Sequence, residues 1–351
     1  MTNKVLLVGH IRLGEDPIDG ETVKNQLILK EIGRYCEVIP LDFFYQKHRF
    51  VLYVRSLLAF ILNPTASIVF STTAKNFISL IKIFRLLRIK RNIVHWIIGG
   101  EFDQNVKDGK FDVSLLNYIS YNLAQSHQMV DNLRSFGVHN AEYVSNFKNI
   151  TFKASIDDII NKRHNSPKKK FVFMSKILRT KGIGIVLDAV ELLNKDGHED
   201  RYCVDFYGPS HPDYMDEFLL RVSMIRNVEY RGVLKFDTRE GYKLLSDYNA
   251  FLFPTFHPSE GVAGVVLDAY ISGLPVIASD WGHNSEYIYN NRTGIIIPPH
   301  DAVALKSVME KIILDQIDID GLARNSMIES VKYDAKNVIT ESFLQKIGIL
   351  N

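Results

Sequence analysis

Two acidic residues, Glu260 and Asp268, stand eight positions apart where a glycine-bearing loop runs into an apolar stretch. The apolar residues of 262–271 predict a helix, and short apolar runs at 251–254 and 275–279 predict strands on either side of it. Glu260 would then lie in the loop at the helix N-terminus, and Asp268 about two turns further along. In that geometry both carboxylates accept hydrogen bonds from hydroxyls of one extended ligand. The free N–H groups of the helix start would face an anion.

This stretch resembles the donor site of the GT-B fold glycosyltransferases, in particular the retaining family 4 enzymes. That family has a Glu, then Gly-Phe-Gly, then a second Glu, then Ala-Met-Ala-x-Gly-x-Pro-Val. The residues that fall in register here are Glu260, Gly261, Asp268, Ala269, Gly273, Pro275, Val276, Ser279 and Glu286. Val262 replaces the phenylalanine, Ala263 the second glycine, and Asp268 the second glutamate.

The resemblance implies that Glu260 contacts the donor sugar as a catalytic residue and that Asp268 contacts the ribose. It also assigns donor binding to the neighbouring residues Gly261, Val262, Ala263 and Gly264. Because Asp is one methylene shorter than Glu, its ribose contact would be longer, water-mediated or made by a shifted helix. The alternative is an ordinary strand-loop-helix-strand unit in which both carboxylates are solvated.

Two lysines, Lys176 and Lys181, lie in a loop between a predicted strand at 171–174 and a predicted helix at 183–194. The loop is similar to the family's Gly-Arg-Leu-x-x-x-Lys-Gly, whose Arg and Lys hold the donor diphosphate. By this resemblance both lysines are catalytic, because fixed cations stabilise the charge that develops on the leaving nucleoside diphosphate. Lys176 keeps the charge of the family arginine but loses its bidentate fork. The alternative is a pair of surface lysines near a linker.

The resemblance is specific over about 171–299 and only topological over the first half. Within the specific part, residues 227–234 resemble the family's Asn-Val-x-Phe-x-Gly-x-Val. This similarity implies that the main chain near Gly232, Val233 and Leu234 faces the nucleobase. Asp318 and Asp320 spell Asp-x-Asp, a metal–nucleotide motif of the other glycosyltransferase fold, but they follow the last recognisable helix of this part, so we expect a solvated turn.

The first half alternates short apolar runs with helical patterns, which predicts a parallel sheet with right-handed crossovers. The expected strands are 4–8, 37–41, 67–71, 92–98 and 121–125, and the expected helices include 21–33 and 127–136. With a chain of 351 residues and a basic, proline-bearing segment at 162–170, we expect two domains. The predicted fold is α/β of the GT-B type, with two Rossmann-like domains facing a cleft. Their predicted bounds are 1–165 for the acceptor domain and 166–329 for the donor domain, with the tail from about 330 to 351 crossing back. Further helices are expected at 242–248 and, as the crossing segment, at 326–347.

Ligands bind beyond the carboxyl ends of the strands in such sheets, so candidate acceptor or cleft residues follow the predicted strands. Gly20 is in register with the family's Gly-rich loop near the sugar and diphosphate. Candidates for the acceptor side are His95, Gly99, Gly100, Glu101, Asp103 and Ser126. His95 stands mid-strand, and a core position is the alternative for it. For Glu101 and Asp103 the alternative is a solvated helix entry, and for Ser126 a helix N-cap.

The overall composition excludes few functions, since the net charge is only +2 and the chain is 46% hydrophobic. Cys36 and Cys203 show no metal or redox spacing, and the N-terminal apolar run is too short for a signal peptide. We therefore expect a cytoplasmic protein, peripheral on the inner face of the plasma membrane if it meets one. We expect no cofactor, no required metal and no nucleic-acid partner.

Acidic residues are missing from 43–100, where the chain average would place about seven. The same stretch contains nine basic residues: Lys47, Arg49, Arg55, Lys75, Lys82, Arg85, Arg88, Lys90 and Arg91. Lys82, Arg85 and Arg88 recur every third residue among apolar ones, and Phe43, Phe44, Tyr45, Phe50 and Tyr53 add aromatic rings. One interpretation is an ordinary crossover helix with a basic wet face. The other, which we favour, is a patch that docks the domain on anionic lipid and presents a lipid-linked acceptor.

The resemblance implies an enzyme of the glycosyltransferase class that moves a sugar from a nucleoside-diphosphate sugar to a glycan or lipid-linked acceptor with retention. Bacterial surface polysaccharide assembly is the implied setting. Two alternatives stay open: a sugar-nucleotide epimerase on the same fold, and a degenerate, non-catalytic sugar-nucleotide-binding protein.

Overall fold

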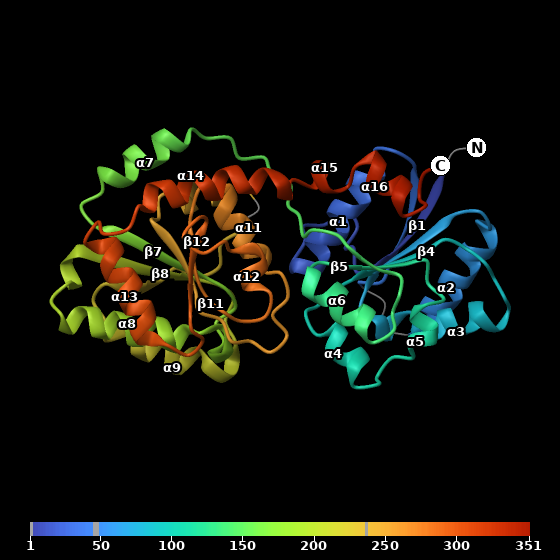
Figure 1. Ribbon diagram of the computed structural model, residues 1–351, viewed down its shortest axis with the longest axis horizontal. Helices are drawn as coiled ribbons and strands as arrows, with labels where there is room; N and C mark the ends of the chain where they lie inside the picture. Colours follow the sequence, from blue (N-terminus) through green and yellow to red (C-terminus); the bar gives the residue numbers. More distant parts are fainter. Residues whose placement is uncertain (1–2, 45–48, 236–237) are drawn as a thin grey trace. The chain divides into compact units, whose positions relative to one another are not determined.

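The computed structural model of the chain describes residues 3–44, 49–235 and 238–351. It divides into two compact units, of which the first comprises 1–149 with 334–351 and the second comprises 150–333 (Figure 1). In the part of the chain that the structure describes, the strands form two six-stranded sheets, and every strand pair is parallel. The predicted α/β fold with two Rossmann-like sheets is therefore confirmed.

The first sheet has the strand order β2-β1-β3-β4-β5-β6. Its strands are β1 (Lys4–Gly9), β2 (Glu37–Asp42), β3 (Ser67–Thr72), β4 (Ile93–Ile97), β5 (Tyr121–Ala124) and β6 (Ala141–Tyr143). The helices of this unit are α1 (Gly20–Ile32), α2 (Arg49–Leu62), α3 (Ile78–Leu86), α4 (Phe102–Lys107), α5 (Val113–Leu116), α6 (His127–Ser135), α15 (Ala335–Val338) and α16 (Glu341–Lys346), with a 3₁₀ turn at Ala74–Asn76.

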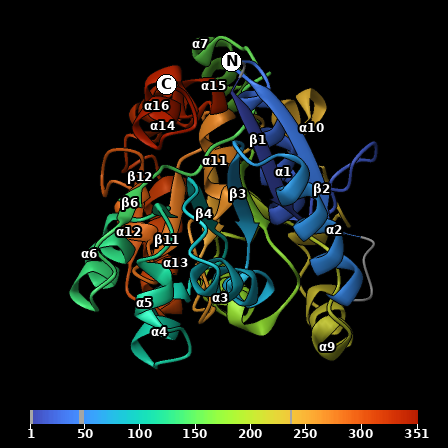
Figure 2. The same cartoon turned by 90° about the vertical axis from the view of Figure 1, so that its right-hand side faces the viewer.

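Successive side chains of a strand point to opposite faces, and each face of the first sheet has its own helices. Val5 and Leu7 pack with α1, α15 and α16, whereas Leu6 and Val8 pack with α2 to α6. The chain's last two helices thus lie beside α1 on one face (Figures 1 and 2). Both faces are covered, which is why these strands are continuous apolar runs rather than alternating ones.

The second sheet has the order β12-β11-β10-β7-β8-β9. Its strands are β7 (Lys169–Met174), β8 (Tyr202–Tyr207), β9 (Val228–Tyr230), β10 (Ala250–Phe253), β11 (Val276–Ser279) and β12 (Gly294–Ile297). The helices are α7 (Ile156–His164), α8 (Ile183–Lys195), α9 (Pro212–Ser223), α10 (Arg239–Leu245), α11 (Gly264–Ile271), α12 (Asn284–Tyr287), α13 (Ala302–Ile313) and α14 (Ile319–Ser330). Three 3₁₀ turns are Arg179–Lys181, Glu199–Arg201 and Val331–Tyr333. Helices α8, α9 and α13 cover one face, and α10 and α11 cover the other.

The unit boundary falls at 149/150 rather than at the expected 165, because α7 packs on the second unit. Its Arg163 is buried and donates to three carbonyl oxygens, those of Ser246 and Gly273 at 2.9 Å and that of Ser272 at 3.3 Å. The guanidinium therefore satisfies the carbonyls at the C-terminal ends of α10 and α11. The basic segment 162–170, expected as a linker, contains the end of α7 and the start of β7.

The tail also differs from the expectation, since 326–347 is not one helix. Helix α14 ends at Ser330, and the chain returns to the first unit through Asp334, whose backbone is extended. There the N–H of Ala335 donates to the carbonyl of Lys148 at 2.8 Å. Thr340 then caps α16. The extended backbone at Asp334, which makes no side-chain cap, and the Thr340 cap each start a new short helix instead of continuing the first.

Two further local expectations differ from the structure in part. Asp318 is exposed, as expected, but it is the N-cap of α14 rather than part of a turn, and its Oδ1 accepts from the N–H of Gly321 at 2.9 Å. Asp320 pairs with His164 at 2.7 Å. The helix expected at 242–248 lies at 239–245, because Thr238 caps it.

Candidate functional site

The second sheet has its topological switch point between β7 and β10. From β7 the chain winds outward to β8 and β9, and it then returns to place β10 against the other side of β7. Helix α8, which follows β7, and helix α11, which follows β10, lie on opposite faces of the sheet. The loops 175–182 and 254–263 therefore diverge at this edge, and ligands of open α/β sheets bind in such a crevice.

Lys181 and Glu260 meet at this switch point, although they are far apart in the sequence. The Lys181 ammonium donates to Oε2 of Glu260 at 2.6 Å, and the hydroxyl of Thr255 donates to the same oxygen at 2.7 Å. Both side chains are largely shielded, with 14% of Lys181 and 9% of Glu260 exposed. The site thus combines a fixed cation and a fixed carboxylate in contact with one another.

Backbone contacts fix the relative position of the two loops. Gly182 has φ of 84°, and a Cβ on it would lie 2.0 Å from the carbonyl oxygen of Pro254. Only glycine permits this approach and this left-handed conformation. The N–H of Phe256 donates to the carbonyl of Thr180 at 2.8 Å. Lys181 is therefore held against the β10 loop by the main chain and not only by its own charge.

A histidine that sequence reasoning passed over organises the β10 loop. His257 Nδ1 lies 2.8 Å from the Thr180 hydroxyl, and its Nε2 lies 3.1 Å from the Ser259 hydroxyl. The indole N–H of Trp281 donates to the His257 carbonyl at 2.8 Å. Polar residues directly after a predicted strand were the available signal, but partners that lie 77 and 24 positions away leave no trace in local sequence.

The N-terminus of α11 is open to an anion. Its N-cap is Ala263, and no side chain among the described residues caps the helix. The residues Gly261, Val262, Ala263 and Gly264 are half-buried around this helix start. The first N–H groups of a helix have no partner within it and carry a partial positive charge. The predicted donor-loop residues thus lie beside Glu260 at a helix end suited to phosphate.

Asp268 lies deeper in α11 than an open ligand contact would require. Its side chain is buried, and Oδ1 accepts a hydrogen bond from the Tyr242 hydroxyl of α10 at 3.1 Å. Tyr242 is itself buried and lies beside Phe152. The carboxylate expected to contact a ribose therefore has a protein partner in this structure.

The loops after β7, β8 and β9 also meet at this end of the sheet. A Cβ on Gly208 would lie 1.7 Å from the carbonyl oxygen of Ser175, and the Gly208 N–H donates to the carbonyl of Gly232 at 2.9 Å. Next in the chain, Val233 is exposed and Leu234 half-buried. Lys176 is exposed on the same loop as Ser175. The segment predicted to face the nucleobase and the predicted phosphate cation are thus at the same sheet edge.

Arg179 is the remaining cation of this loop, and it is engaged elsewhere. Its guanidinium forms a bidentate pair with Glu217 and lies 4.6 Å from the ring centroid of Tyr214. Of the other two cations of the loop, Lys181 contacts Glu260 and Lys176 is exposed.

In the first unit, His95 lies in the core rather than at a strand end. It is fully buried, its Nδ1 lies 3.2 Å from Oδ1 of Asn122, and its ring lies between those of Phe77 and Phe102. Burial lowers the pKa of His95 to about 4, so the imidazole is neutral at physiological pH. The structure therefore gives His95 a packing position.

The other first-unit candidates follow strands as expected, but two of them have local partners. Ser126 is the N-cap of α6 and accepts from the N–H of Met129 at 2.9 Å. Asp103 accepts from Asn132 at 2.7 Å, which ties α4 to α6. Glu101 is exposed. The turn before it contains Gly99, whose φ is 100°, and Gly100.

Gly20 is the first residue of α1, where Asp19 and Thr22 form a capping box. A Cβ on Gly20 would meet no described atom within 4 Å, so internal packing does not require glycine there. The position leaves room for a ligand at the carboxyl end of β1, which with β3 forms the switch point of the first sheet.

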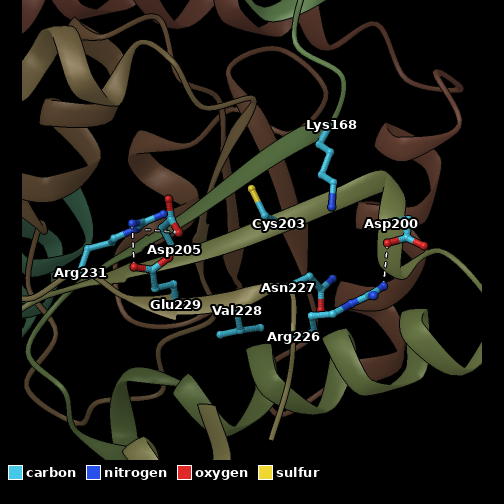
Figure 3. Close-up of a pocket in the computed structure, with 9 residues that line it drawn as sticks. All are labelled: Lys168, Asp200, Cys203, Asp205, Arg226, Asn227, Val228, Glu229 and Arg231. Atoms are coloured by element: carbon cyan, nitrogen blue, oxygen red, sulfur yellow. Dashed lines mark hydrogen bonds and ion pairs between the residues drawn. The ribbon is translucent and has the colours of Figure 1, made fainter. Parts of the chain in front are cut away.

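A separate pocket lies on the β7–β8–β9 side of the second sheet (Figure 3). It is lined by Lys168, Asp200, Cys203, Asp205, Arg226, Asn227, Val228, Glu229 and Arg231. Several of these residues precede their strands, so the pocket reaches the end of the sheet opposite to the loops of Lys181 and Glu260. Its charges pair internally, Arg231 with Asp205 at 3.2 Å and with Glu229 at 2.7 Å, and Arg226 with Asp200 at 2.6 Å. We assign no ligand to it.

Within the described ranges, no group of three or more His, Cys, Asp or Glu side chains could hold a metal ion.

Comparison with known proteins gives a family match over the second unit. Residues 168–315 match the family model described as "Glycosyl transferases group 1". Among curated proteins, the chain is 26% identical over 151 residues to the D-inositol 3-phosphate glycosyltransferase of Corynebacterium diphtheriae. It is 23% identical over 155 residues to the amylovoran biosynthesis glycosyltransferase AmsK of Erwinia amylovora. These alignments cover 42% and 43% of this chain but only 35% and 37% of the two relatives.

Solved structures match the chain over its whole length. HepE of Anabaena, crystallised in complex with UDP, superposes with a TM-score of 0.73 at 16% identity, covering 99% of this chain and 100% of that one. Sucrose-phosphate synthase of Thermosynechococcus elongatus superposes with a TM-score of 0.72 at 16% identity, covering 98% of each chain. The fold predicted from the sequence, GT-B, is therefore confirmed.

Proposed function

We propose that this chain is a glycosyltransferase, because residues 168–315 match the model of the group 1 glycosyl transferases. It takes a sugar from a nucleoside-diphosphate sugar held by the second unit and transfers it to a glycan or lipid-linked acceptor, with retention of configuration at the anomeric carbon. The setting we propose is the assembly of a bacterial surface polysaccharide.

The observation that carries this proposal is the contact of Lys181 and Glu260 beside the uncapped N-terminus of α11. A nucleoside diphosphate needs cations and free N–H groups, and both are present at one switch point. When the glycosidic bond breaks, negative charge grows on the diphosphate. Lys181, Lys176 and the N–H groups of α11 would stabilise that charge without moving.

Glu260 would serve the sugar. Its carboxylate accepts hydrogen bonds, and in this structure Oε2 already receives two, from Lys181 and from Thr255. In the proposed donor complex the Lys181 ammonium donates to the diphosphate instead of to Glu260. Hydroxyls of the sugar then donate to the Glu260 carboxylate. No residue of this site is proposed as a nucleophile. Retention then requires the acceptor to attack from the face that the diphosphate leaves, with the departing phosphate accepting the acceptor's proton.

The relatives suggest which substrates to test first. AmsK is named for amylovoran biosynthesis, and HepE was crystallised with UDP. We therefore propose a polysaccharide-type acceptor and a uridine diphosphate sugar as the first donor to examine. No cofactor enters the proposal, and we expect turnover in the presence of a chelator.

The experiment is a thermal-shift screen of nucleoside diphosphates and their sugars, followed by donor hydrolysis without acceptor. A ligand that binds only the native state stabilises it by RT ln(1 + [L]/Kd), so the unfolding temperature rises with the logarithm of the ligand concentration once the site is saturated. Binding with slow release of nucleoside diphosphate supports a transferase. Binding with no release after long incubation supports a degenerate binding protein, and conversion of the donor to an epimeric sugar nucleotide supports an epimerase. No shift with any nucleotide contradicts the donor site.

A further inference from the structure

Helix α2 has an apolar side that the structure leaves exposed. Its exposed residues recur every three or four positions along one stripe, as on one face of a helix. They are Val51, Val54, Arg55, Leu58, Ile61 and Leu62. At the C-terminal end the exposed fraction is 72% for Ile61 and 77% for Leu62. A surface helix of a globular protein normally presents polar residues there, so this stripe requires an explanation.

The opposite side of α2 is already used by the core. Ser56 and Phe60 are buried, and the Phe60 ring meets the Phe84 ring of α3 edge-on, with centroids 5.3 Å apart. Arg91 reinforces this junction by donating to the carbonyls of Phe60 at 2.9 Å and Ala66 at 2.6 Å. The exposed stripe is thus held in place by a packed interior and is not a misplaced core face.

Helix α3 continues the apolar surface and adds charge. Three apolar side chains at its C-terminal end are exposed, Ile83, Leu86 and Leu87. Exposed cations stand between and beside them, Lys82, Arg85, Arg88 and Lys90. Phe60 and Phe84 join the two helices at these ends. We therefore define the α2–α3 surface as the exposed residues named above: Val51, Val54, Arg55, Leu58, Ile61 and Leu62 of α2, with Lys82, Ile83, Arg85, Leu86, Leu87, Arg88 and Lys90 on and after α3.

The charges that face this surface are almost all positive. The chain has no Asp or Glu between 43 and 100. From the neighbouring segment, Asp112 lies 3.9 Å from Arg85, whose Nη1 also donates to Ser114 at 2.6 Å. Arg91 does not contribute to the surface, because its guanidinium donates to backbone carbonyls. Lys47 and Tyr45 lie outside the described residues. Arg88 and Lys90 remain as exposed cations at the edge of the apolar side chains.

We infer that the α2–α3 surface docks on an anionic lipid bilayer, with its apolar side chains in the headgroup–acyl boundary and its cations at the lipid phosphates. Helices with an apolar face and basic residues lie in the interface plane in this way. None of the helices in the described ranges has the length and apolar character of a membrane span. Helix α2 has 14 residues, about 21 Å against a hydrocarbon core of about 30 Å.

The structure changes what the charge pattern alone predicted. A purely electrostatic patch would bind only at low salt, whereas exposed leucines and isoleucines add a contribution that salt does not screen. A second copy of the chain is a weaker candidate for the partner of this surface, because the cations of the two copies would repel each other. The inference does not depend on the proposed sugar transfer, since it rests on the first unit alone.

The test is flotation of the full chain with vesicles of phosphatidylcholine alone and of phosphatidylcholine mixed equally with phosphatidylglycerol. We expect binding to the mixed vesicles at about 0.15 M salt and weaker but measurable binding at about 1 M. Ile61→Gln with Leu62→Gln should lower the affinity at least about tenfold at both salt concentrations. Arg88→Gln with Lys90→Gln should lower it about thirtyfold at 0.15 M, at roughly fivefold per cation, and little at 1 M.

The matched control is Leu219→Gln with Leu220→Gln on α9, where two leucines are also exposed. It should bind vesicles like the parent. Every variant must keep the parent's unfolding temperature. Brominated lipid should quench the fluorescence of the tryptophan introduced by Leu62→Trp, and it should not quench that of the tryptophan introduced by Leu220→Trp. Absence of vesicle binding by the parent overturns the inference, as does an equal loss in the control pair. A dimer in sedimentation that Ile61→Gln with Leu62→Gln dissociates would assign the surface to a second copy instead.

Discussion

Replacing Glu260 by glutamine separates the two tasks of the proposed donor site. In the structure the Glu260 carboxylate accepts from Lys181 at 2.6 Å, so a diphosphate has to compete with it for the lysine. Glutamine keeps the shape but offers only a neutral acceptor. A hydrogen bond to a charged group contributes about 1.5–3 kcal/mol and one to a neutral group about 0.5–1.5 kcal/mol. The difference, about 1–1.5 kcal/mol, should make nucleoside diphosphate bind about tenfold more tightly.

Turnover should change in the opposite direction. If sugar hydroxyls donate to Glu260 in the donor complex, the variant replaces a charged hydrogen bond at the sugar by a neutral one, a loss of about 1–1.5 kcal/mol. Transfer or donor hydrolysis should then slow by about fivefold to tenfold. Calorimetric titration with nucleoside diphosphate and a hydrolysis assay measure the two effects on the same preparation.

The control is Glu217→Gln on α9. It removes an exposed carboxylate that pairs with Arg179, which lies on the same loop as Lys181. It changes the net charge by the same amount but should leave both affinity and turnover within about twofold, because exposed ion pairs contribute little. Unchanged or weaker diphosphate binding in Glu260→Gln, with the fold intact, would refute the reasoning, since Lys181 would then not be the phosphate cation.

Four further changes test other parts of the structure. Lys181→Ala should weaken nucleoside diphosphate by about 1.5–3 kcal/mol and leave nucleoside unaffected, as calorimetry with both ligands would report. Lys176→Arg should bind diphosphate as well as the parent or better, because arginine restores the bidentate fork; tenfold weaker binding would contradict that role. Tyr242→Phe should lower the free energy of unfolding by about 1–3 kcal/mol in urea titrations, because buried Asp268 loses its donor. Burial lowers the pKa of His95 from 6.5 to about 4, so the unfolded chain binds a proton that the native state does not. Stability should therefore fall by about 3 kcal/mol between pH 6.5 and 4, and His95→Gln should remove that slope.

Strands and their order of appearance could be predicted well from the sequence, because both sheets are covered on two faces. Buried parallel strands are apolar over most of their length, so β1, β3, β10 and β11 each show three or more consecutive apolar residues. Helix bounds were less accurate at α10 and in the C-terminal tail. Thr238 caps α10 through its hydroxyl, whereas Asp334 precedes α15 with an extended backbone and no side-chain cap. Composition does not show which of several polar residues will start a helix.

For the candidate site, the sequence could predict the residue types but not their partners. The motif spacing led to Lys181 and Glu260, yet their contact depends on the crossing of two loops at Gly182 and Pro254. The same spacing suggested a ribose contact for Asp268, whereas its hydrogen bond comes from Tyr242 of the preceding helix, α10. Long-range partners follow from topology, and a single sequence carries no direct record of them.

The sequence also did not show which residues of the α2–α3 surface are exposed. Helix α2 is apolar except at Arg49, Arg55 and Ser56. Because Arg55 is exposed and Ser56 beside it is buried, its polar positions do not mark the outer face. Sequence reasoning therefore relied on the basic residues, with the apolar and aromatic residues near them, and it predicted a patch that docks on anionic lipid. In the structure Phe60 is buried, whereas Ile61 and Leu62 are exposed. The expected binding to lipid therefore depends on exposed apolar area as well as on charge. Because apolar burial is not screened by salt while charge attraction is, binding to vesicles at high salt is the measurement that distinguishes the two.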